Sequence, residues 1–183
     1  GELAQGIGDL REKLGELLEN HLRPLSYRLY PSILRRGLVA ALQSLGDQFE
    51  AALTIDLELG EELTRRERAN PQLIPEQIRL AAYRIAEEAL TNAVKHAGAR
   101  KVSLKLELVS NEWLCTTVKD NGKGFDLEGA SAGLGILMMQ DYAEVVGGVC
   151  IIRSALREGT GVTSMLPLSG PGAEHPEKAS PLE

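Results

Sequence analysis

Hydrophobic side chains recur at helical spacing through the first fifty residues. One stripe of leucines returns every three or four positions, with charged residues between its members: Leu10, Leu14, Leu18, Leu22, Leu25 and Leu29. This spacing predicts a helix over residues 3–22 and, after interruptions at Pro24 and Pro31, a second helix from Ile33 to Glu50. A single amphipathic arm cannot bury its own stripe. It must fold back on the chain or pair with another chain, and we favour pairing.

Alternating hydrophobic and polar positions predict five strands farther along the chain. The first covers residues 52–59, ALTIDLEL, and the polar segment over residues 60–75, which holds two prolines, is expected to be a loop. Residues 101–109 and 113–119 predict one hairpin, closed by a turn over residues 110–112. Residues 149–155 and 161–168 predict a second hairpin around residues 157–159.

A long helix is predicted between the first strand and the hairpins. It starts near Pro75 and contains YRIAEEALTNAVKHA, residues 83–97. Five apolar residues recur at helical spacing and should face the core: Ile78, Ala82, Ile85, Ala89 and Ala93. Four polar residues line up on another face: Arg84, Glu88, Asn92 and Lys95. A carboxylate, an amide and an ammonium on successive turns can hold a metal ion and phosphate oxygens, although ordinary solvated faces show the same Glu–Lys spacing.

A last helix is expected from Ile136 to Val146, ended by Gly147 and Gly148. The order of elements predicts an α/β two-layer sandwich: a mixed sheet of about five strands with helices on one face, plus a helical N-terminal arm. We divide the chain into an arm (1–50), a main domain (51–168) and a tail (169–183). The tail is rich in Pro, Gly, Ser and charge, so we expect it to be disordered.

Composition narrows the function classes. The net charge of −6 over 183 residues argues against a general nucleic-acid surface. The sequence has no run of about 18 apolar residues, so we expect no membrane-spanning segment. Cys115 and Cys150 lie in apolar strands, where we expect buried, reduced thiols, and the lack of CxxC and HExxH spacing argues against a zinc enzyme. An anionic ligand would need local positive charge and backbone N–H groups.

The motif Asp120-x-Gly122-x-Gly124 follows a strand of mostly apolar residues. A carboxylate at the end of a buried strand loses hydration, which is costly unless a donor meets it, and the glycines allow backbone and ligand to approach closely. An exocyclic amine such as adenine N6 suits this carboxylate. Guanine places a carbonyl oxygen there instead, so the site should reject GTP by a factor on the order of 10⁴. The same residues are also compatible with a plain Asp-Asn-Gly turn.

Gly133-Leu134-Gly135 precedes the last predicted helix. Free N–H groups at a helix start, with no Cβ in the way, can bind phosphate. The motif is not a Rossmann fingerprint, because position 138 is Met138, and the chain has no GxxxxGK[ST] sequence. A glycine-rich helix start can equally be structural.

Taken in order, these motifs resemble the GHKL ATP-binding family, which includes gyrase, Hsp90, histidine kinases and MutL. The matching series is Glu88-xxx-Asn92-xx-Lys95-His96, the DxGxG motif, the GLG motif, and Gly159-Thr160 on the last strand. YRIAEEALTNAVKHA, GLGI and the GT-x-V-x-x-x-L-P ending look most like the catalytic domain of sensor histidine kinases that pair with LuxR- or NarL-type response regulators. The resemblance covers about residues 26–168. It implies a Bergerat-type ATP-binding fold with a short ATP lid over residues 126–132.

The resemblance also implies a role for each matching residue. Asn92 would coordinate a Mg²⁺ ion that bridges the ATP phosphates, and Lys95 and His96 would approach those phosphates. Asp120 would hold adenine N6, with Thr160 supporting it through water. The remaining residues would shape the lid and the phosphate loop: Gly122, Gly124, Gly133, Leu134 and Gly135.

Glu88 keeps other activities open. In the hydrolysing relatives this position activates water, whereas in a kinase Glu88 would orient the metal or the phosphoacceptor. One alternative is therefore an ATPase or a serine kinase on the same fold. A second alternative is a non-catalytic module that binds ATP or dimerises.

Residues 22–45 look like the second helix of the dimerisation and phosphoacceptor hairpin of these kinases. The expected phosphoacceptor histidine, followed by Asp or Glu, is absent: His21 precedes Leu22, and His175 lies in the tail. The resemblance therefore implies a kinase fragment that binds ATP and passes the γ-phosphoryl group to a histidine outside this chain, then to an aspartate of a response regulator. It also implies a homodimeric parent with this domain in the cytoplasm. The sequence leaves the parent's membrane attachment open.

Overall fold

The computed structural model describes residues 31–126 and 133–170, and from Ile33 onward they belong to one compact unit. Its helical elements are the 3₁₀ turn η2 (Ser32–Arg36), α3 (Leu38–Phe49), α4 (Glu61–Ala69), α5 (Glu76–Asn92), the π turn η3 (Ala93–Ala97) and α6 (Leu134–Val145). Its strands are β1 (Thr54–Leu59), β2 (Lys101–Val109), β3 (Trp113–Asp120), β4 (Val149–Ala155) and β5 (Gly159–Pro167). The predicted helix over residues 3–22, lid residues 127–132 and the tail from residue 171 lie outside the described residues. Among the described helices, none is long and apolar enough to cross a membrane.

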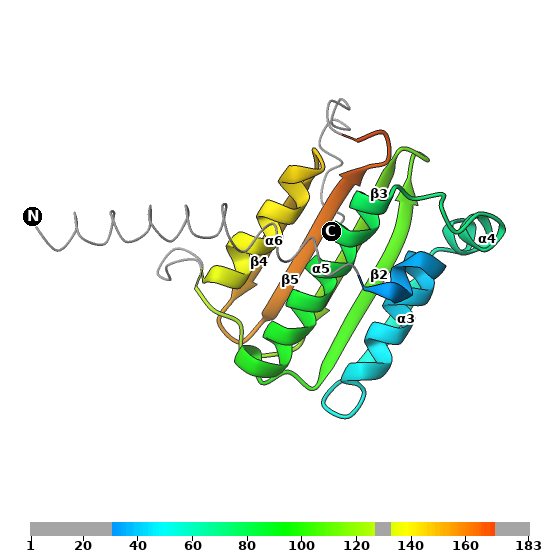
Figure 1. The fold of residues 1–183 in the computed structure, drawn as a ribbon. Coiled ribbons are helices and arrows are strands. Elements are labelled where there is room, and N and C mark those ends of the chain that lie inside the picture. Colours follow the sequence, from blue (N-terminus) through cyan, green and yellow to red (C-terminus); the bar gives the residue numbers. More distant parts are fainter. Residues whose placement is uncertain (1–30, 127–132, 171–183) are drawn as a thin grey trace, which may run out of the picture. The chain divides into compact units, whose positions relative to one another are not determined.

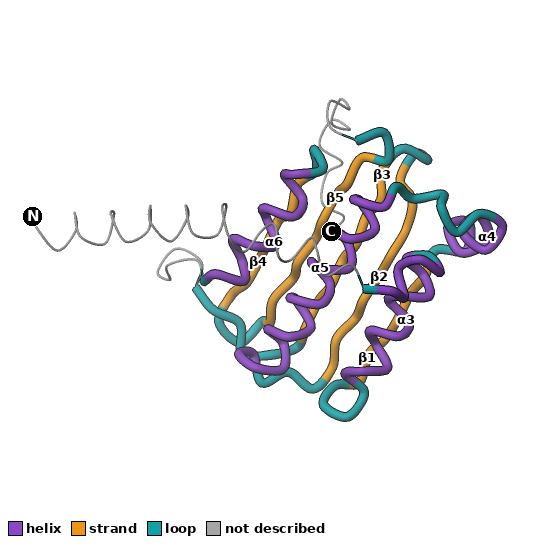
Figure 2. The backbone as a smooth tube through the Cα atoms, in the orientation of Figure 1, coloured by secondary structure: helices purple, strands orange, loops and turns teal. Residues whose placement is uncertain are grey.

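The five strands form one mixed sheet in the order β1-β2-β3-β5-β4. β1 runs parallel to β2 and the other neighbouring pairs are antiparallel, which confirms the two predicted hairpins, β2–β3 and β4–β5. Helices α3, α5 and α6 cover one face of the sheet (Figure 1), and Figure 2 shows them as a layer in front of the strands. The predicted α/β sandwich, with a mixed sheet and helices on one face, is therefore confirmed.

Strand alternation decides which side chains face the helices. In β2 the alternate residues Val102, Leu104 and Leu106 are fully buried, and Leu104 pairs across the ladder with the buried Val118 of β3. Each buried aliphatic side chain stabilises the fold by roughly 1.5–3 kcal/mol. A shift of one residue in register would expose this whole row. Burial of the row therefore fixes which face of the sheet every other side chain of the strand occupies.

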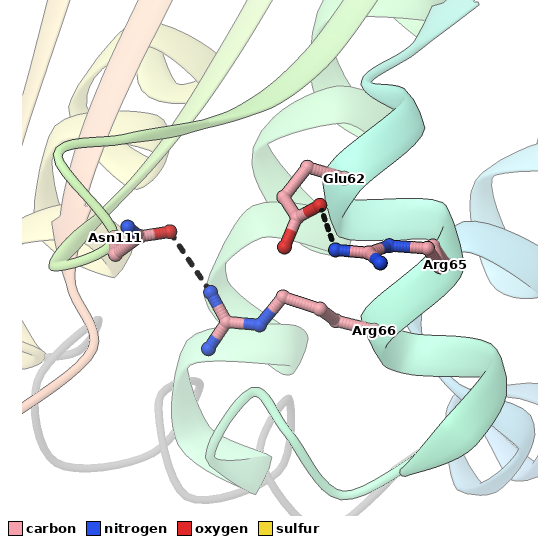
Figure 3. Close-up of polar contacts among 4 residues, drawn as sticks. All are labelled: Glu62, Arg65, Arg66 and Asn111. Atoms are coloured by element: carbon pink, nitrogen blue, oxygen red, sulfur yellow. Dashed lines mark hydrogen bonds and ion pairs between the residues drawn. The ribbon is translucent and has the colours of Figure 1, made fainter.

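Residues 61–69, which we expected to lie in a loop, form helix α4. Glu61 and Glu62 lie in its first turn and Arg66 and Arg68 in its last, which matches the helix dipole, while Leu63 is buried. Figure 3 shows Arg66 donating a 2.9 Å hydrogen bond to Asn111 in the β2–β3 turn. The loop prediction was wrong because a single buried apolar position gives no helical period, and contacts with other elements hold the helix in place.

Two buried charged residues fix the start of α3. Glu67 of α4 is only 3% exposed, and its two carboxylate oxygens accept hydrogen bonds from the N–H groups of Leu38 and Val39, both at 2.7 Å. Arg79 of α5 donates to the carbonyl oxygen of Leu34 at 2.9 Å. Gly37, which lies between η2 and α3, has φ 107°, and a Cβ there would collide with the Glu67 side chain. We call this cluster the α3 joint.

The α3 joint changes the picture of residues 33–50. The predicted single helix is divided at Gly37 into η2 and α3. Its apolar stripe, which includes Leu38, Leu42 and Leu45, is at most 1% exposed, and α3 contacts α5 and β1. This stripe is buried within the compact unit, so our preference for pairing with another chain was wrong for this helix.

The two cysteines are free thiols. Cys150 is buried, and this burial raises the pKa of its thiol to about 12. Cys115 is only half-buried, and burial again raises the pKa of its thiol. The expectation of burial therefore holds for Cys150 and only in part for Cys115.

Candidate functional site

A cavity of about 560 Å³ is lined by residues of α5, η3, α6 and strands β3, β4 and β5. Ten of the residues singled out from the sequence line it: Glu88, Asn92, Lys95, His96, Asp120, Gly124, Gly133, Leu134, Gly135 and Thr160. Asp120 and Asn92, which come from different motifs, thus face one hollow. Its volume is within the range of small-molecule pockets, roughly 300–1,000 Å³.

Asp120 ends β3 at the rim of this cavity and is half-buried. Its Oδ1 accepts a 2.7 Å hydrogen bond from the N–H of Gly122. Among the described residues its second oxygen has no hydrogen-bond partner. Gly122 does not line the cavity; a Cβ at this position would collide with Ala97 and with the Asp120 carboxylate. Gly122 therefore positions Asp120, and the free oxygen is available to a donor in the cavity.

The glycine-rich segment after β3 is held by backbone hydrogen bonds. The N–H of Lys123 donates to the carbonyl oxygen of Ala97 at 3.0 Å, and the N–H of Arg157 donates to that of Lys123 at 2.6 Å. Gly124 has φ +59°, and a Cβ on it would collide with the carbonyl of Ala155. These contacts place Lys123, the variable residue between the two glycines of the motif, at the cavity.

The polar face of α5 reaches the cavity through a change of helix type. In a continuous α-helix, at about 100° per residue, His96 would lie about 80° around the axis from Glu88. Residues 93–97 instead form the π turn η3, which advances less per residue and carries His96 back toward the face of Glu88 and Asn92. Lys95 and His96 both line the cavity. The α-helical periodicity of the sequence did not predict this turn.

The start of α6 lies against Glu88 and forms another part of the cavity lining. We expected the helix to begin at Ile136, but it begins at Leu134, with Gly133 as its N-cap, so the GLG motif forms the cap and first turn. A Cβ on Gly135 would collide with the Glu88 carboxylate and lie 3.2 Å from Asn92 Nδ2. A larger residue at this position would have to displace the end of the Glu88 side chain. The N–H groups of Ile136 and Leu137 donate to the carbonyl oxygen of Gly133, whereas those of Leu134 and Gly135 have no acceptor among the described residues and are therefore suited to an anion.

An apolar floor lies beneath these polar groups and was missed from the sequence. Val118 of β3 pairs with Val162 of β5, which pairs with Ile152 of β4, so the three side chains form one row across the sheet. Val118 stands two residues before Asp120 and Val162 two residues after Thr160, so strand alternation was the signal that could have found them. A flat apolar floor with a hydrogen-bond acceptor at its edge fits a purine ring carrying an amine.

Comparison with protein families identifies the class of protein. The family model described as histidine kinase-, DNA gyrase B-, and HSP90-like ATPase matches residues 77–170. The chain belongs to this family. These are the residues that build α5, the cavity and the last four strands. Membership in a family of ATPases makes ATP the nucleotide of this domain.

Individual relatives are sensor kinases. The chain is 36% identical over 156 residues to the sensor histidine kinase MctS of Rhizobium johnstonii, which covers 81% of this chain and 32% of that protein. It is 34% identical over 155 residues to the oxygen sensor histidine kinase NreB of Staphylococcus carnosus, which covers 83% of this chain and 43% of the relative. The chain thus spans less than half the length of these relatives.

Solved structures show the same fold. The histidine kinase domain of a blue-light activated histidine kinase from Erythrobacter litoralis matches with a TM-score of 0.54 at 22% identity, over 71% of this chain and 58% of that chain. The histidine kinase AdeS of Acinetobacter baumannii matches with a TM-score of 0.55 at 16% identity, over 91% of this chain and 84% of that one. The sheet and its helices are therefore those of a histidine kinase ATPase domain.

Proposed function

We propose that this chain is the ATP-binding catalytic domain of a two-component sensor histidine kinase. The kinase would transfer the γ-phosphoryl group of ATP to a histidine, and from there to an aspartate of a response regulator. The observation that carries this proposal is the meeting of Asp120 and Asn92 at one cavity in a chain of the histidine kinase-like ATPase family. One side chain can select the purine, and the other can bind a metal-linked triphosphate.

The residues around the cavity fit ATP and Mg²⁺ group by group. The free oxygen of Asp120 would accept a hydrogen bond from adenine N6, and the apolar floor would contact the adenine ring. Asn92 would ligate Mg²⁺, which prefers oxygen ligands and usually keeps several waters, so one amide oxygen plus phosphate oxygens suffices. Lys95 would neutralise phosphate charge, and His96 would approach the phosphates beside it. Phosphoryl transfer depends mainly on such positioning and charge neutralisation.

The N–H groups of Leu134 and Gly135 at the start of α6 would hold the terminal phosphates, next to Glu88. In a kinase, Glu88 would orient the metal or the accepting histidine. The close contact between Glu88 and Gly135 also supports a second candidate, an ATPase of the same fold. A carboxylate beside the proposed phosphate-binding site can activate water.

The parent protein is proposed to be a cytoplasmic or membrane-anchored homodimer. The part of the predicted arm before Ile33 would belong to the dimerisation and phosphoacceptor region. Helix α3 would join residues 51–168 in the catalytic domain, because its apolar stripe is buried in that compact unit. The similarity to sensor kinases supports a response regulator as partner. We propose a LuxR- or NarL-type regulator, on the strength of the YRIAEEALTNAVKHA and GLGI motifs.

The test is a transfer assay in two parts. The chain is mixed with a separately produced phosphoacceptor hairpin and ATP labelled at the γ-phosphate, and both labelled hairpin and free phosphate are followed. Acid-labile, base-stable label on the hairpin is expected for a histidine kinase. Steady phosphate release without labelled hairpin would instead identify an ATPase. ATP binding with neither product would leave a non-catalytic binding module and overturn the kinase proposal.

A further inference from the structure

Ser154 of β4 connects three groups at the edge of the cavity. Its Oγ accepts a 2.9 Å hydrogen bond from the N–H of Phe125, and it donates to the carbonyl oxygen of Gly159 at 3.0 Å. The same Oγ lies 3.0 Å from Oγ1 of Thr160, which is directly opposite in the β4–β5 register. Phe125 and Thr160 both line the cavity. Thr160 belongs to one of the predicted motifs, whereas Ser154 belongs to none.

The proton count at Ser154 decides the direction of the bond to Thr160. A serine hydroxyl has one proton to give and two lone pairs to accept with. The carbonyl of Gly159 can only accept, so the Ser154 proton goes there, and the N–H of Phe125 occupies one lone pair. All three contacts are made together only when Thr160 donates its own proton to Ser154. The oxygen of Thr160 then has only lone pairs left for the cavity.

Thr160 and Asp120 stand at the same end of the β3–β5 ladder. Asp120 follows Lys119 in β3, Thr160 precedes Gly161 in β5, and Lys119 pairs with Gly161. The free oxygen of the Asp120 carboxylate is an acceptor, and the Thr160 oxygen is an acceptor once its proton is held by Ser154. A purine that carries a 6-amino group meets acceptors there, directly or through water. A purine with a 6-oxo group meets acceptor against acceptor.

Resting on the proposed function, we propose that Ser154 is a positioning residue that makes the cavity selective for 6-aminopurine nucleotides by fixing the proton of Thr160. Without the Ser154 hydroxyl, the Thr160 hydroxyl is free to rotate and donate to a 6-oxo group. Ser154 thus acts on the nucleotide only through Thr160.

The experiment compares the affinities for ATP and inosine triphosphate, which differ at the purine 6-position, by titration calorimetry with Mg²⁺. The wild-type chain is expected to prefer ATP at least 100-fold. Ser154→Ala should lower this preference about tenfold, the equivalent of one neutral hydrogen bond. Ser154→Thr, which keeps a hydroxyl, should restore it. If Ser154→Ala does not fold, Ser154→Cys, a weak donor and acceptor, takes its place with the same expected fall.

A double-mutant cycle separates a specific effect from a structural one. In a Thr160→Val background, adding Ser154→Ala should leave the ratio of the two affinities unchanged, because the residue through which Ser154 acts is gone. Thr163→Val, which removes a hydroxyl from the other face of β5, is the matched control and should have no effect. An unchanged ratio in Ser154→Ala, or an effect that persists without Thr160, would overturn this inference alone. A wild-type chain that binds neither nucleotide would overturn the proposed function.

Discussion

The polar residues at the two ends of α5 differ in where their hydrogen-bond partners come from. At the α3 joint, the Arg79 guanidinium makes three hydrogen bonds, to Leu34, Pro71 and Gln72, and only its Nε has no partner among the described residues. Thirteen residues along the same helix, the side chain of Asn92 makes no hydrogen bond to any described residue, and Asn92 lines the cavity. Both positions are polar. The first is completed by the protein itself, and the second is left for a ligand.

This difference separates structural from functional polar residues. A buried charge without partners costs several kcal/mol, so evolution of a stable fold requires internal partners such as the helix ends at the joint. A polar group that faces a cavity keeps water as its partner until a ligand replaces it. Its replacement should therefore change binding much more than stability, and the reverse should hold at the joint.

The largest expected effect is on stability, at the joint. Glu67→Ala leaves the N–H groups of Leu38 and Val39 without their acceptor and should lower the free energy of unfolding by about 3 kcal/mol. ATP affinity of the folded protein should not change. Urea unfolding and calorimetry measure the two quantities. Glu62→Ala is the control: Glu62 pairs with Arg65 at the surface (Figure 3), and its loss should cost about 0.5 kcal/mol or less. Equal costs for the two variants would contradict this account of the joint.

The next effect is on binding, at the rim of the cavity. Asp120→Asn keeps an oxygen for the N–H of Gly122 but turns an amide donor toward the purine amine, so ATP affinity should fall at least about 100-fold, or about 2.7 kcal/mol. Unfolding free energy should change by less than about 1 kcal/mol. The matched control is Asp47→Asn, an exposed position on α3. Calorimetry that finds the same affinity in both variants would remove Asp120 from the adenine site.

The comparison also shows which features the sequence can predict. Asn92 and Asp120 could be selected because local spacing and residue chemistry identify them, and strand alternation gave the faces of β2 and β3. Helix α4 could not be predicted, because its buried residues include Glu67, whose partners lie 28 and 29 residues away in the chain. The π turn was not predicted because it continues the helical pattern of α5 and only shifts the spacing of the residues that follow. Ser154 belongs to no motif, and its role depends on the turn over residues 156–158, which sets the register that places Ser154 opposite Thr160.

The smallest expected effect is on Mg²⁺-dependent ATP binding, and it tests whether Asn92 is a binding residue. Asn92→Ala should weaken ATP binding about tenfold when Mg²⁺ is present and hardly at all when the metal is chelated, because the lost group is proposed to be a metal ligand. Asn92→Asp, which keeps a ligating oxygen, should retain the response to Mg²⁺. Since Asn92 has no partner to lose and alanine has the higher helix propensity, the melting temperature of Asn92→Ala should stay the same or rise. A lower melting temperature, or a loss of affinity that is equal with and without Mg²⁺, would place Asn92 with the structural residues of the α3 joint.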